Sequence, residues 1–277
     1  MPFSVPESLV IIAGRGAYPV LLAESARTQG VKRICAVAFK GETRETLTAL
    51  VDEIQWVHLG QLAPVLEALK AFAIPRAVMA GQIKPTHLFR VRMDSRMLTL
   101  LARLKERNAE TIFAAVGEAF RDVGVELEPA SRFMEKTMPG AGVLGTRPPT
   151  AEEQQDIELG IRVAKTTSAL DIGQTVVIKH GTILAVEAFE GTDATILRAG
   201  ELGGAGAVVV KVAKCNHDMR FDIPVIGDHT MKVLKKAKIS VLAVEAGRTI
   251  LLEREKLIEE ARKQNLCFVA VPSATNP

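Results

Sequence analysis

A run of carboxylates in the second half of the chain is the first candidate for chemistry. Glu187, Glu190 and Asp193 crowd an expected passage from a strand into a helix, where Thr192 is suited to cap the helix. Capping needs one such side chain, so the others are available for another role. Asp193 could hold a hydrated Mg²⁺ or orient a water, and the amides of Gly191 and Thr192 could bind an anion beside it. The alternative is a capped surface turn.

Basic residues follow this carboxylate run. Lys211 and Lys214 end a strand that reads as buried, and Arg220 and Asp222 come shortly after them. Cations near a carboxylate suit phosphoryl chemistry, because positive charge stabilises the phosphoryl oxygens while an aspartate holds a metal ion or activates water. A set of structural ion pairs would have the same composition, and the residues alone do not decide between the two.

The first half offers a weaker phosphate site. Gly14 and Gly16 follow an expected strand and open an expected helix, where exposed N–H groups and the helix dipole favour anions. A dinucleotide fingerprint needs a third glycine where this chain has Pro19, which argues against a redox dinucleotide. Gln82 ends another strand, at the sheet edge where open α/β sheets bind ligands. A tight turn and a solvated glutamine are the alternatives.

The segment 84–107 is basic and amphipathic. It could lie on an anionic membrane, or it could be a helix packed on the core with a basic outer face. Seven basic residues oppose Asp94 and Glu106, and five apolar residues form a stripe: Lys84, Arg90, Arg92, Arg96, Arg103, Lys105 and Arg107, with Met97, Leu98, Leu100, Leu101 and Leu104.

Two α/β domains are expected to position these groups. In residues 1–139, short aliphatic strands alternate with helices, which predicts an open parallel, Rossmann-like sheet. The expected strands are 9–13, 34–38, 56–59 and 77–80, and the helices 17–29, 63–73, 95–107 and 110–123. Glycines and prolines make 140–149 an expected linker.

Residues 150–277 are expected to form a mixed-sheet, catalytic α/β domain. Thr150 and Glu153 fit a capping box at the start of a helix over 150–168. His180 and Gly181 fit a hairpin turn between strands 175–179 and 182–188. The remaining elements are strands 207–212, 239–244 and 266–271, an extended 220–226, and helices near 229–238 and 253–264.

Composition narrows the function classes. The chain of 277 residues is 48% hydrophobic but only 4% aromatic, which favours an aliphatic α/β core and disfavours base-stacking surfaces. A net charge of +3 is too balanced for a dedicated nucleic-acid binder. Three scattered cysteines, no secretion signal and no apolar run long enough to span a membrane predict a cytoplasmic protein.

Several segments in collinear order resemble the LpxI family of UDP-2,3-diacylglucosamine pyrophosphatases. The most specific is AVEAFEGTD at 185–193; the others are 9–19, 170–174, 210–214, 220–227 and 244–248. The resemblance implies a hydrolase of lipid A synthesis that releases UMP and 2,3-diacylglucosamine 1-phosphate. It also implies a requirement for Mg²⁺ or Mn²⁺, peripheral contact with the inner membrane, and a homodimer.

The resemblance also assigns residues. Asp222 takes the role of catalytic metal ligand or water activator, with Asp193 beside it and Lys214 neutralising phosphate. The remaining substrate-binding candidates are Gly14, Gly16, Gln82, Gln174, Thr192, Lys211 and Glu245. Family members usually have Gly in place of Arg15, often Asn in place of Gln82, and a Gly-Asp-Asp run where this chain has Arg107, Asn108 and Ala109. A noncatalytic binder of nucleotide-sugar or lipid-linked sugar phosphate is therefore the alternative, and a nucleotide-dependent oxidoreductase a more distant one.

Overall fold

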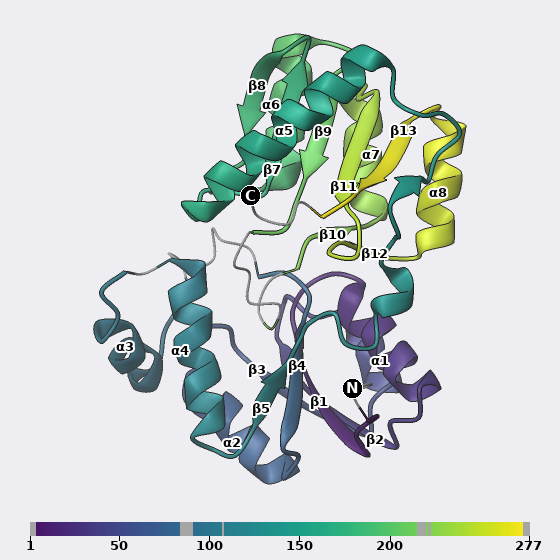
Figure 1. The fold of residues 1–277 in the computed structure, drawn as a ribbon. Coiled ribbons are helices and arrows are strands. Elements are labelled where there is room, and N and C mark those ends of the chain that lie inside the picture. The colour runs from purple at the N-terminus through teal and green to yellow at the C-terminus, as the bar shows by residue number, and fades with distance from the viewer. Residues whose placement is uncertain (1–3, 84–90, 107, 215–219, 221–222, 274–277) are drawn as a thin grey trace. The chain divides into compact units, whose positions relative to one another are not determined.

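The computed structural model describes residues 4–83, 91–106, 108–214, 220 and 223–273. The chain forms two compact units. Of the described residues, the first unit contains 4–134 and Arg220, and the second unit contains the rest from Glu135 onward. Each unit has its own sheet covered by helices (Figure 1). No helix among the described residues is long and apolar enough to cross a membrane.

The N-terminal unit contains a five-stranded parallel sheet in the order β3-β2-β1-β4-β5. The strands are β1 (Ser8–Ala13), β2 (Arg33–Phe39), β3 (Glu53–Val57), β4 (Arg76–Ala80) and β5 (Glu126–Glu128). β1 and β2 are almost wholly buried, because helices cover both faces of a parallel sheet. This order reverses between β1 and β4, which in doubly wound folds is the switch point where ligands bind.

Different helices pack on the two faces of this sheet. The helices are α1 (Tyr18–Thr28), α2 (Leu62–Phe72), α3 (Ser95–Ala102) and α4 (Ala109–Arg121), with a 3₁₀ turn η1 (Glu45–Ala49). Val10 and Ile12 of β1 share a core with α2 and α4, whereas α1 packs with η1. Alternate residues of one strand thus face different helices.

The C-terminal unit contains a mixed six-stranded sheet in the order β6-β13-β11-β9-β7-β8. The strands are β6 (Gly142–Val143), β7 (Thr175–Lys179), β8 (Thr182–Val186), β9 (Val208–Lys211), β11 (Val241–Glu245) and β13 (Cys267–Val271). β9, β11 and β13 are parallel, while β7 runs antiparallel to β9. A separate pair is formed by β10 (Val225–Ile226) and β12 (Ile250–Leu251).

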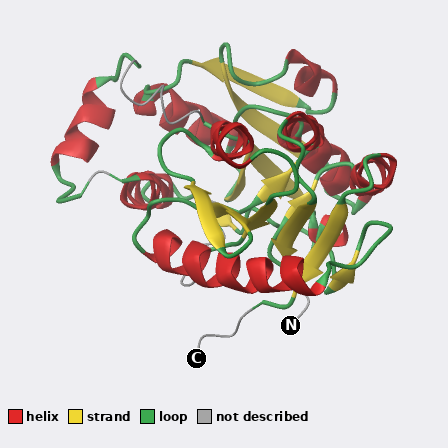
Figure 2. Cartoon of the chain, turned by 90° about the horizontal axis from the view of Figure 1, so that it is seen from above, coloured by secondary structure: helices red, strands yellow, loops and turns green. Residues whose placement is uncertain are grey.

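α-Helices cover both faces of this sheet (Figure 2). α5 (Ala151–Ala169) covers one face, and α6 (Thr192–Gly203), α7 (Asp228–Lys236) and α8 (Arg254–Lys263) cover the other. Gly160 allows α5 to pack closely against β9, because a Cβ at Gly160 would lie only 2.5 Å from Val210 Cγ2. A 3₁₀ turn, η3 (Glu135–Thr137), precedes the sheet.

The predicted fold class is confirmed, including the capping box at Thr150 and the β7–β8 hairpin. His180 and Gly181 both have positive φ, 48° and 72°, as this type of tight turn requires. Asp156 of α5 fixes the turn by accepting both of their N–H groups.

Some boundaries differ from expectation. β3 covers 53–57 rather than 56–59, and α3 ends at Ala102 instead of continuing to 107. The expected linker contains β6, which pairs antiparallel with β13. Two-residue strands such as β6 and β12 are too short to show a hydrophobic periodicity in the sequence. They form by pairing with a neighbouring strand.

Candidate active site

Most C-terminal candidates gather at one edge of the sheet. β9 and β11 end at this edge, and Lys211 and Glu245 are their last residues. β7 begins there because it is antiparallel, so Thr175 pairs with Lys211. β8 ends beside it, which brings Glu187 next to Gln174. Residues far apart in the sequence, such as Thr175 and Lys211, therefore meet at the carboxyl ends of the parallel strands.

Lys211, Thr192 and Glu187 form a hydrogen-bonded chain. The Lys211 ammonium lies 2.9 Å from Thr192 Oγ1, and the Thr192 hydroxyl donates to Glu187 Oε1 at 2.8 Å. Thr192 is not the helix cap, contrary to expectation: Gly191 takes that position with φ of 83°, and Thr192 is the first helical residue. Its hydroxyl is consequently turned toward the lysine.

Gly173 allows two loops at this edge, the one before β7 and the one after β8, to approach each other closely. A Cβ at Gly173 would lie 2.2 Å from the carbonyl oxygen of Glu187, a distance that no side chain tolerates. Beside it, the Gln174 N–H donates to Glu187 Oε2 at 3.3 Å, and the Gln174 carbonyl accepts from Val212 N–H at 3.1 Å. The backbone of Gln174 is thus fixed between β8 and the end of β9.

Lys214 lies further along the same edge. Its ammonium pairs with Asp171, which has φ of 57°, and the two side chains are 15% and 22% exposed. The Lys214 carbonyl accepts a hydrogen bond from Arg248 Nη2 at 3.1 Å. Lys211, Lys214 and Arg248 therefore bring three cations to the end of the sheet, where Asp171, Glu187 and Glu245 lie close to them.

Glu245 lies beneath this surface. Its side chain is 1% exposed, and its oxygens accept from Lys165 Nζ at 2.8 Å, Ala213 N–H at 2.9 Å and Ser273 Oγ at 2.6 Å. Burial opposes ionisation, but the hydrogen bonds from Lys165, Ser273 and Ala213 outweigh it and hold the pKa of Glu245 below its usual range.

The glycine loop of the N-terminal unit uses its amides internally. Gly14 N–H donates to Ala80 O at 2.7 Å, and Arg15 and Gln82 exchange backbone hydrogen bonds of 2.9 and 3.1 Å. Cβ atoms would meet the opposite backbone at 3.0 Å from Gly14 and 2.7 Å from Gly81. Gly14 therefore serves the close approach of two loops, whereas Gly16, with φ of 99°, has open space around it.

Two family models match consecutive parts of the chain. The LpxI N-terminal domain matches residues 8–137, and the LpxI C-terminal domain matches residues 140–269. The protein belongs to the LpxI family. A relative from Caulobacter vibrioides (strain ATCC 19089 / CIP 103742 / CB 15), described as UDP-2,3-diacylglucosamine pyrophosphatase LpxI, is 31% identical over 283 residues. That match covers 97% of this chain and 99% of the relative.

A solved structure of phosphoribosylglycinamide synthetase from Anaerococcus prevotii is also similar, at 12% sequence identity and a TM-score of 0.26. The match covers 64% of this chain and only 37% of that one. The LpxI assignment rests on the family models and the Caulobacter relative.

The three carboxylates of the LpxI-like 185–193 segment point to different partners. Glu187 faces Thr192, whereas Glu190 pairs with Arg198 at 2.7 Å. Asp193 Oδ2 lies 3.2 Å from His229 Nε2 of α7, and its side chain is 43% exposed. We call Lys211, Lys214 and Arg248 the lysine cluster. Within the described structure, only Glu187 of the three carboxylates is linked to it, through Thr192.

A metal ion was expected between Asp193 and Asp222. Asp222 lies outside the described residues. Within the part of the chain that the structure describes, no group of three or more His, Cys, Asp or Glu side chains could hold a metal. Asp193 and His229 offer one carboxylate and one imidazole, which is not the all-oxygen set that Mg²⁺ prefers. These described residues do not by themselves fit a magnesium site.

Lys165, Asp171, Arg248 and Ser273 were not predicted as site residues. Lys165 had a signal, because Ile157, Ile161 and Lys165 recur every four residues and share the inward stripe of α5. A lysine on such a stripe needs a buried partner. The others depend on contacts between loops, which leave no pattern in the sequence.

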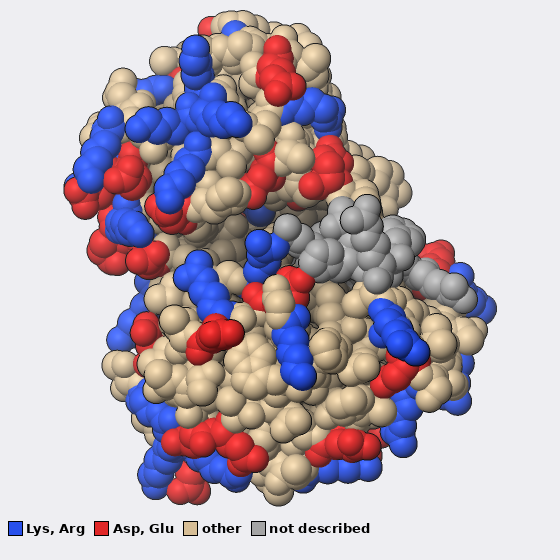
Figure 3. Space-filling model, turned by 180° about the vertical axis from the view of Figure 1, so that it is seen from behind, with Lys and Arg blue, Asp and Glu red and all other residues tan. Residues whose placement is uncertain are grey.

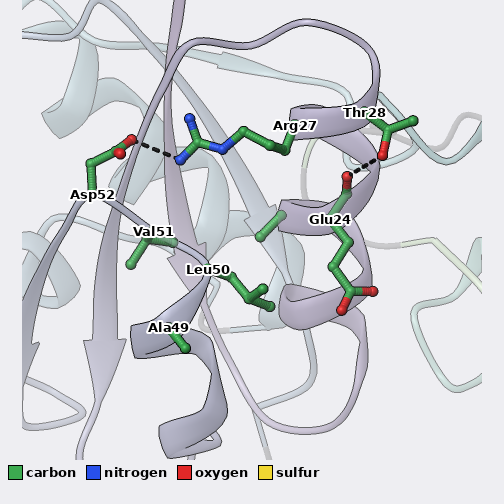
Figure 4. Close-up of a pocket in the computed structure, with 8 residues that line it drawn as sticks. Glu24, Arg27, Thr28, Ala49, Leu50, Val51 and Asp52 are labelled. Atoms are coloured by element: carbon green, nitrogen blue, oxygen red, sulfur yellow. Dashed lines mark hydrogen bonds and ion pairs between the residues drawn. The ribbon is translucent and has the colours of Figure 1, made fainter.

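A surface hollow in the N-terminal unit lies between α1 and the segment that leads into β3 (Figure 4). Arg27 of α1 closes one side through a 2.8 Å ion pair with Asp52. Hydrogen bonds from Ile34 N–H and from Arg27 lower the pKa of Asp52. None of the predicted site residues lines this hollow.

Proposed function

We propose that this protein hydrolyses the pyrophosphate bond of UDP-2,3-diacylglucosamine and releases UMP and 2,3-diacylglucosamine 1-phosphate in lipid A biosynthesis. The observation that carries the proposal is the match to the Caulobacter protein of that name over nearly the full length of both chains. The lysines at the edge of the C-terminal sheet suit the same substrate, because a diphosphate needs cations around its oxygens.

The candidate residues have the following physical roles in this proposal. Lys211 and Lys214 offset charge on the diphosphate as the bond to the leaving phosphate breaks. Thr192 orients Lys211 through its hydroxyl, and Glu187 fixes the direction of that hydroxyl. Asp222 is proposed to hold the metal ion or to activate the attacking water, the two roles that the family resemblance gives it.

The direct test is release of UMP from UDP-2,3-diacylglucosamine by the purified full chain, with Asp222→Ala and Asp222→Asn beside it. We expect multiple turnovers from the wild type, loss of turnover in both variants, and retained substrate binding. Circular dichroism and the melting temperature check folding. A folded wild type without UMP release, or an Asp222→Asn variant with a near-normal rate, would contradict the proposal.

A noncatalytic binder is the second candidate. It is favoured by Arg15, which replaces a glycine usual in the family, and by the use of the Gly14 amide within the fold. Tight binding of UDP-2,3-diacylglucosamine without multiple turnovers would support this candidate. The same turnover assay therefore separates the two functions.

Metal dependence, assembly and location complete the proposal. Mg²⁺ or Mn²⁺ is proposed as cofactor, with Asp222 as its ligand; loss of activity in EDTA and recovery on adding either ion would test this. A homodimer is proposed and is tested by sedimentation. A cytoplasmic protein in peripheral contact with the inner membrane is proposed because the substrate carries two acyl chains.

A further inference from the structure

A buried ion pair lies directly below the lysine cluster. Lys165 of α5 and Glu245 of β11 approach to 2.8 Å, with side chains 13% and 1% exposed. Removing two charges from water costs free energy that their attraction often only just recovers. A buried ion pair is therefore weak evidence for a contribution to stability. The contacts of this pair indicate a different role.

Both members of the pair bind the same backbone residue. Glu245 Oε2 accepts the Ala213 N–H at 2.9 Å, while Lys165 Nζ donates to the Ala213 carbonyl oxygen at 2.8 Å. Ala213 is completely buried and directly precedes Lys214. The ion pair thus holds the N–H and the C=O groups of one residue at the exit of β9.

The contacts of Lys214 continue from this point. Its carbonyl accepts from Arg248 Nη2, and Arg248 Nη1 lies 3.7 Å from Glu245 Oε1. Its ammonium reaches Asp171 on the loop after α5, the helix that carries Lys165. The direction of the Lys214 side chain consequently depends on the residues that fix Ala213.

Glu245 itself is poorly placed to meet a ligand. Its two oxygens already accept from Lys165, Ala213 and Ser273, and the side chain is 1% exposed. A direct substrate contact would require breaking these bonds in a buried position. Glu245 is therefore suited to holding other residues in place.

We propose that Lys165 and Glu245 are positioning residues that fix Ala213 and thereby present the Lys214 ammonium to the diphosphate of the substrate. The proposal rests on the proposed function for its substrate. Its structural part, the clamp on Ala213, concerns only hydrogen bonds within the chain and is measurable without any turnover.

The same sheet offers a matched control pair. Arg147 binds Glu153 through two hydrogen bonds of 2.7 and 2.8 Å, and Arg147 Nη2 also donates to the carbonyl of Ser240, which precedes β11. These side chains are 27% and 15% exposed. The pair therefore resembles Lys165–Glu245 in chemistry but lies at the opposite end of β11.

The experiment compares Lys165→Met, Lys214→Ala, their double variant and Arg147→Met, at a temperature where circular dichroism shows all four folded. We expect Lys165→Met to lower kcat/KM at least tenfold and the double variant to match Lys214→Ala, because both act through the same ammonium. Arg147→Met should stay within about twofold of the wild type. Additive losses, or an equal loss in Arg147→Met, would overturn the proposal.

Amide hydrogen exchange provides the readout that does not depend on activity. Ala213 N–H should exchange at least tenfold faster in Lys165→Met and in Glu245→Ala than in the wild type, and it should be unchanged in Arg147→Met. An unchanged exchange rate of Ala213 N–H in both Lys165→Met and Glu245→Ala would show that the ion pair does not hold Ala213. Normal clamp behaviour in a wild type that releases no UMP would instead reject the proposed function. If Lys165→Met does not fold, Glu245→Gln replaces it in both measurements.

Discussion

The ammonium of Lys211 lies 2.9 Å from the hydroxyl oxygen of Thr192, and that hydroxyl gives its proton to Glu187. One small side chain therefore accepts from a cation and donates to a carboxylate. The Thr192 hydroxyl has one proton, and that proton is directed to Glu187. The lone pairs of the Thr192 oxygen are therefore free to accept from Lys211.

Thr192→Val should lower kcat/KM about tenfold without unfolding the protein. Valine keeps the volume of threonine, but Lys211 loses its acceptor and Glu187 its donor, at a cost of about 1 to 3 kcal/mol for such groups. Steady-state kinetics of UMP release measures the effect. Thr192→Ser, which keeps the hydroxyl, is the control and should stay near wild type; equal losses in both variants would contradict the role of the hydroxyl.

Gly173→Ala should destabilise the C-terminal unit and reduce activity together. The added Cβ would lie 2.2 Å from the Glu187 carbonyl oxygen, so the loop before β7 must move away from β8. We expect a loss of about 1 to 3 kcal/mol, the usual range for overpacking, in urea-induced unfolding.

Gly140→Ala provides its control, because no atom lies within 4 Å of a Cβ at that position. Its free energy of unfolding should change little. A Gly173→Ala protein as stable as Gly140→Ala would show that the loop contact is easily relaxed.

Glu245 should contribute to stability in a pH-dependent way. Although burial opposes ionisation, hydrogen bonds from Lys165, Ser273 and Ala213 lower the pKa of Glu245 in the folded state. A carboxyl with a lowered pKa stabilises the fold above the pKa of the unfolded state, about 4.3, and this stabilisation is lost as pH falls through the lower folded value.

We therefore expect Glu245→Gln to flatten the decline of unfolding free energy between about pH 5 and pH 3, even though the variant is less stable at pH 7. Urea unfolding at several pH values measures this slope. Glu7→Gln, which removes an exposed carboxylate 3.1 Å from Lys32, is the control and should keep the wild-type slope. An identical slope in Glu245→Gln would refute the prediction.

The segment around α3 should bind anionic membranes. Leu98 of α3 is 55% exposed. Arg96 lies in α3, Arg92 precedes the helix, and Arg103 and Lys105 follow it; none of these four has a carboxylate partner among the described side chains. Asp94 is occupied, because it caps α3 at Met97 N–H and also accepts from Ala63 N–H. Each basic residue near an anionic surface contributes about 1 kcal/mol to binding.

Arg96→Glu with Arg103→Glu should therefore reduce sedimentation with phosphatidylglycerol vesicles at least tenfold, and high salt should do the same to the wild type. Lys235→Glu with Lys236→Glu makes the same charge change on α7. Lys232 of α7 pairs with Asp228 at 2.6 Å. In Figure 3, basic side chains of the C-terminal unit lie among carboxylates. Equal losses in both double variants would show a nonspecific charge effect.

Regular patterns predicted most of the fold. The aliphatic runs of β1 and β2 and the alternation of strands with helices indicated the parallel sheet, and the capping box at Thr150 and the turn at His180 were recognisable from local residues. Local rules failed where an equally local alternative existed: Gly191 with positive φ displaced Thr192 from the cap.

The candidate site was predictable in its residue types but not in its connections. Lys211, Gln174 and Glu187 do meet at one edge, as strand order dictates. The partnership of Lys165 with Glu245 spans 80 positions and depends on where α5 crosses the sheet. Such a distance in sequence carries no pattern that a single chain reveals.

The contact between Gly14 and Gly81 has a consequence for screening ligands. Strand order alone would nominate the N-terminal unit for NAD or flavin, yet two loop backbones already hydrogen-bond to each other at the switch point. A pyrophosphate would have to separate them before reaching the Gly14 amide. We therefore expect NAD and flavins to leave the melting temperature of the protein unchanged. Nucleotide diphosphates that carry a lipid are the better first ligands to screen.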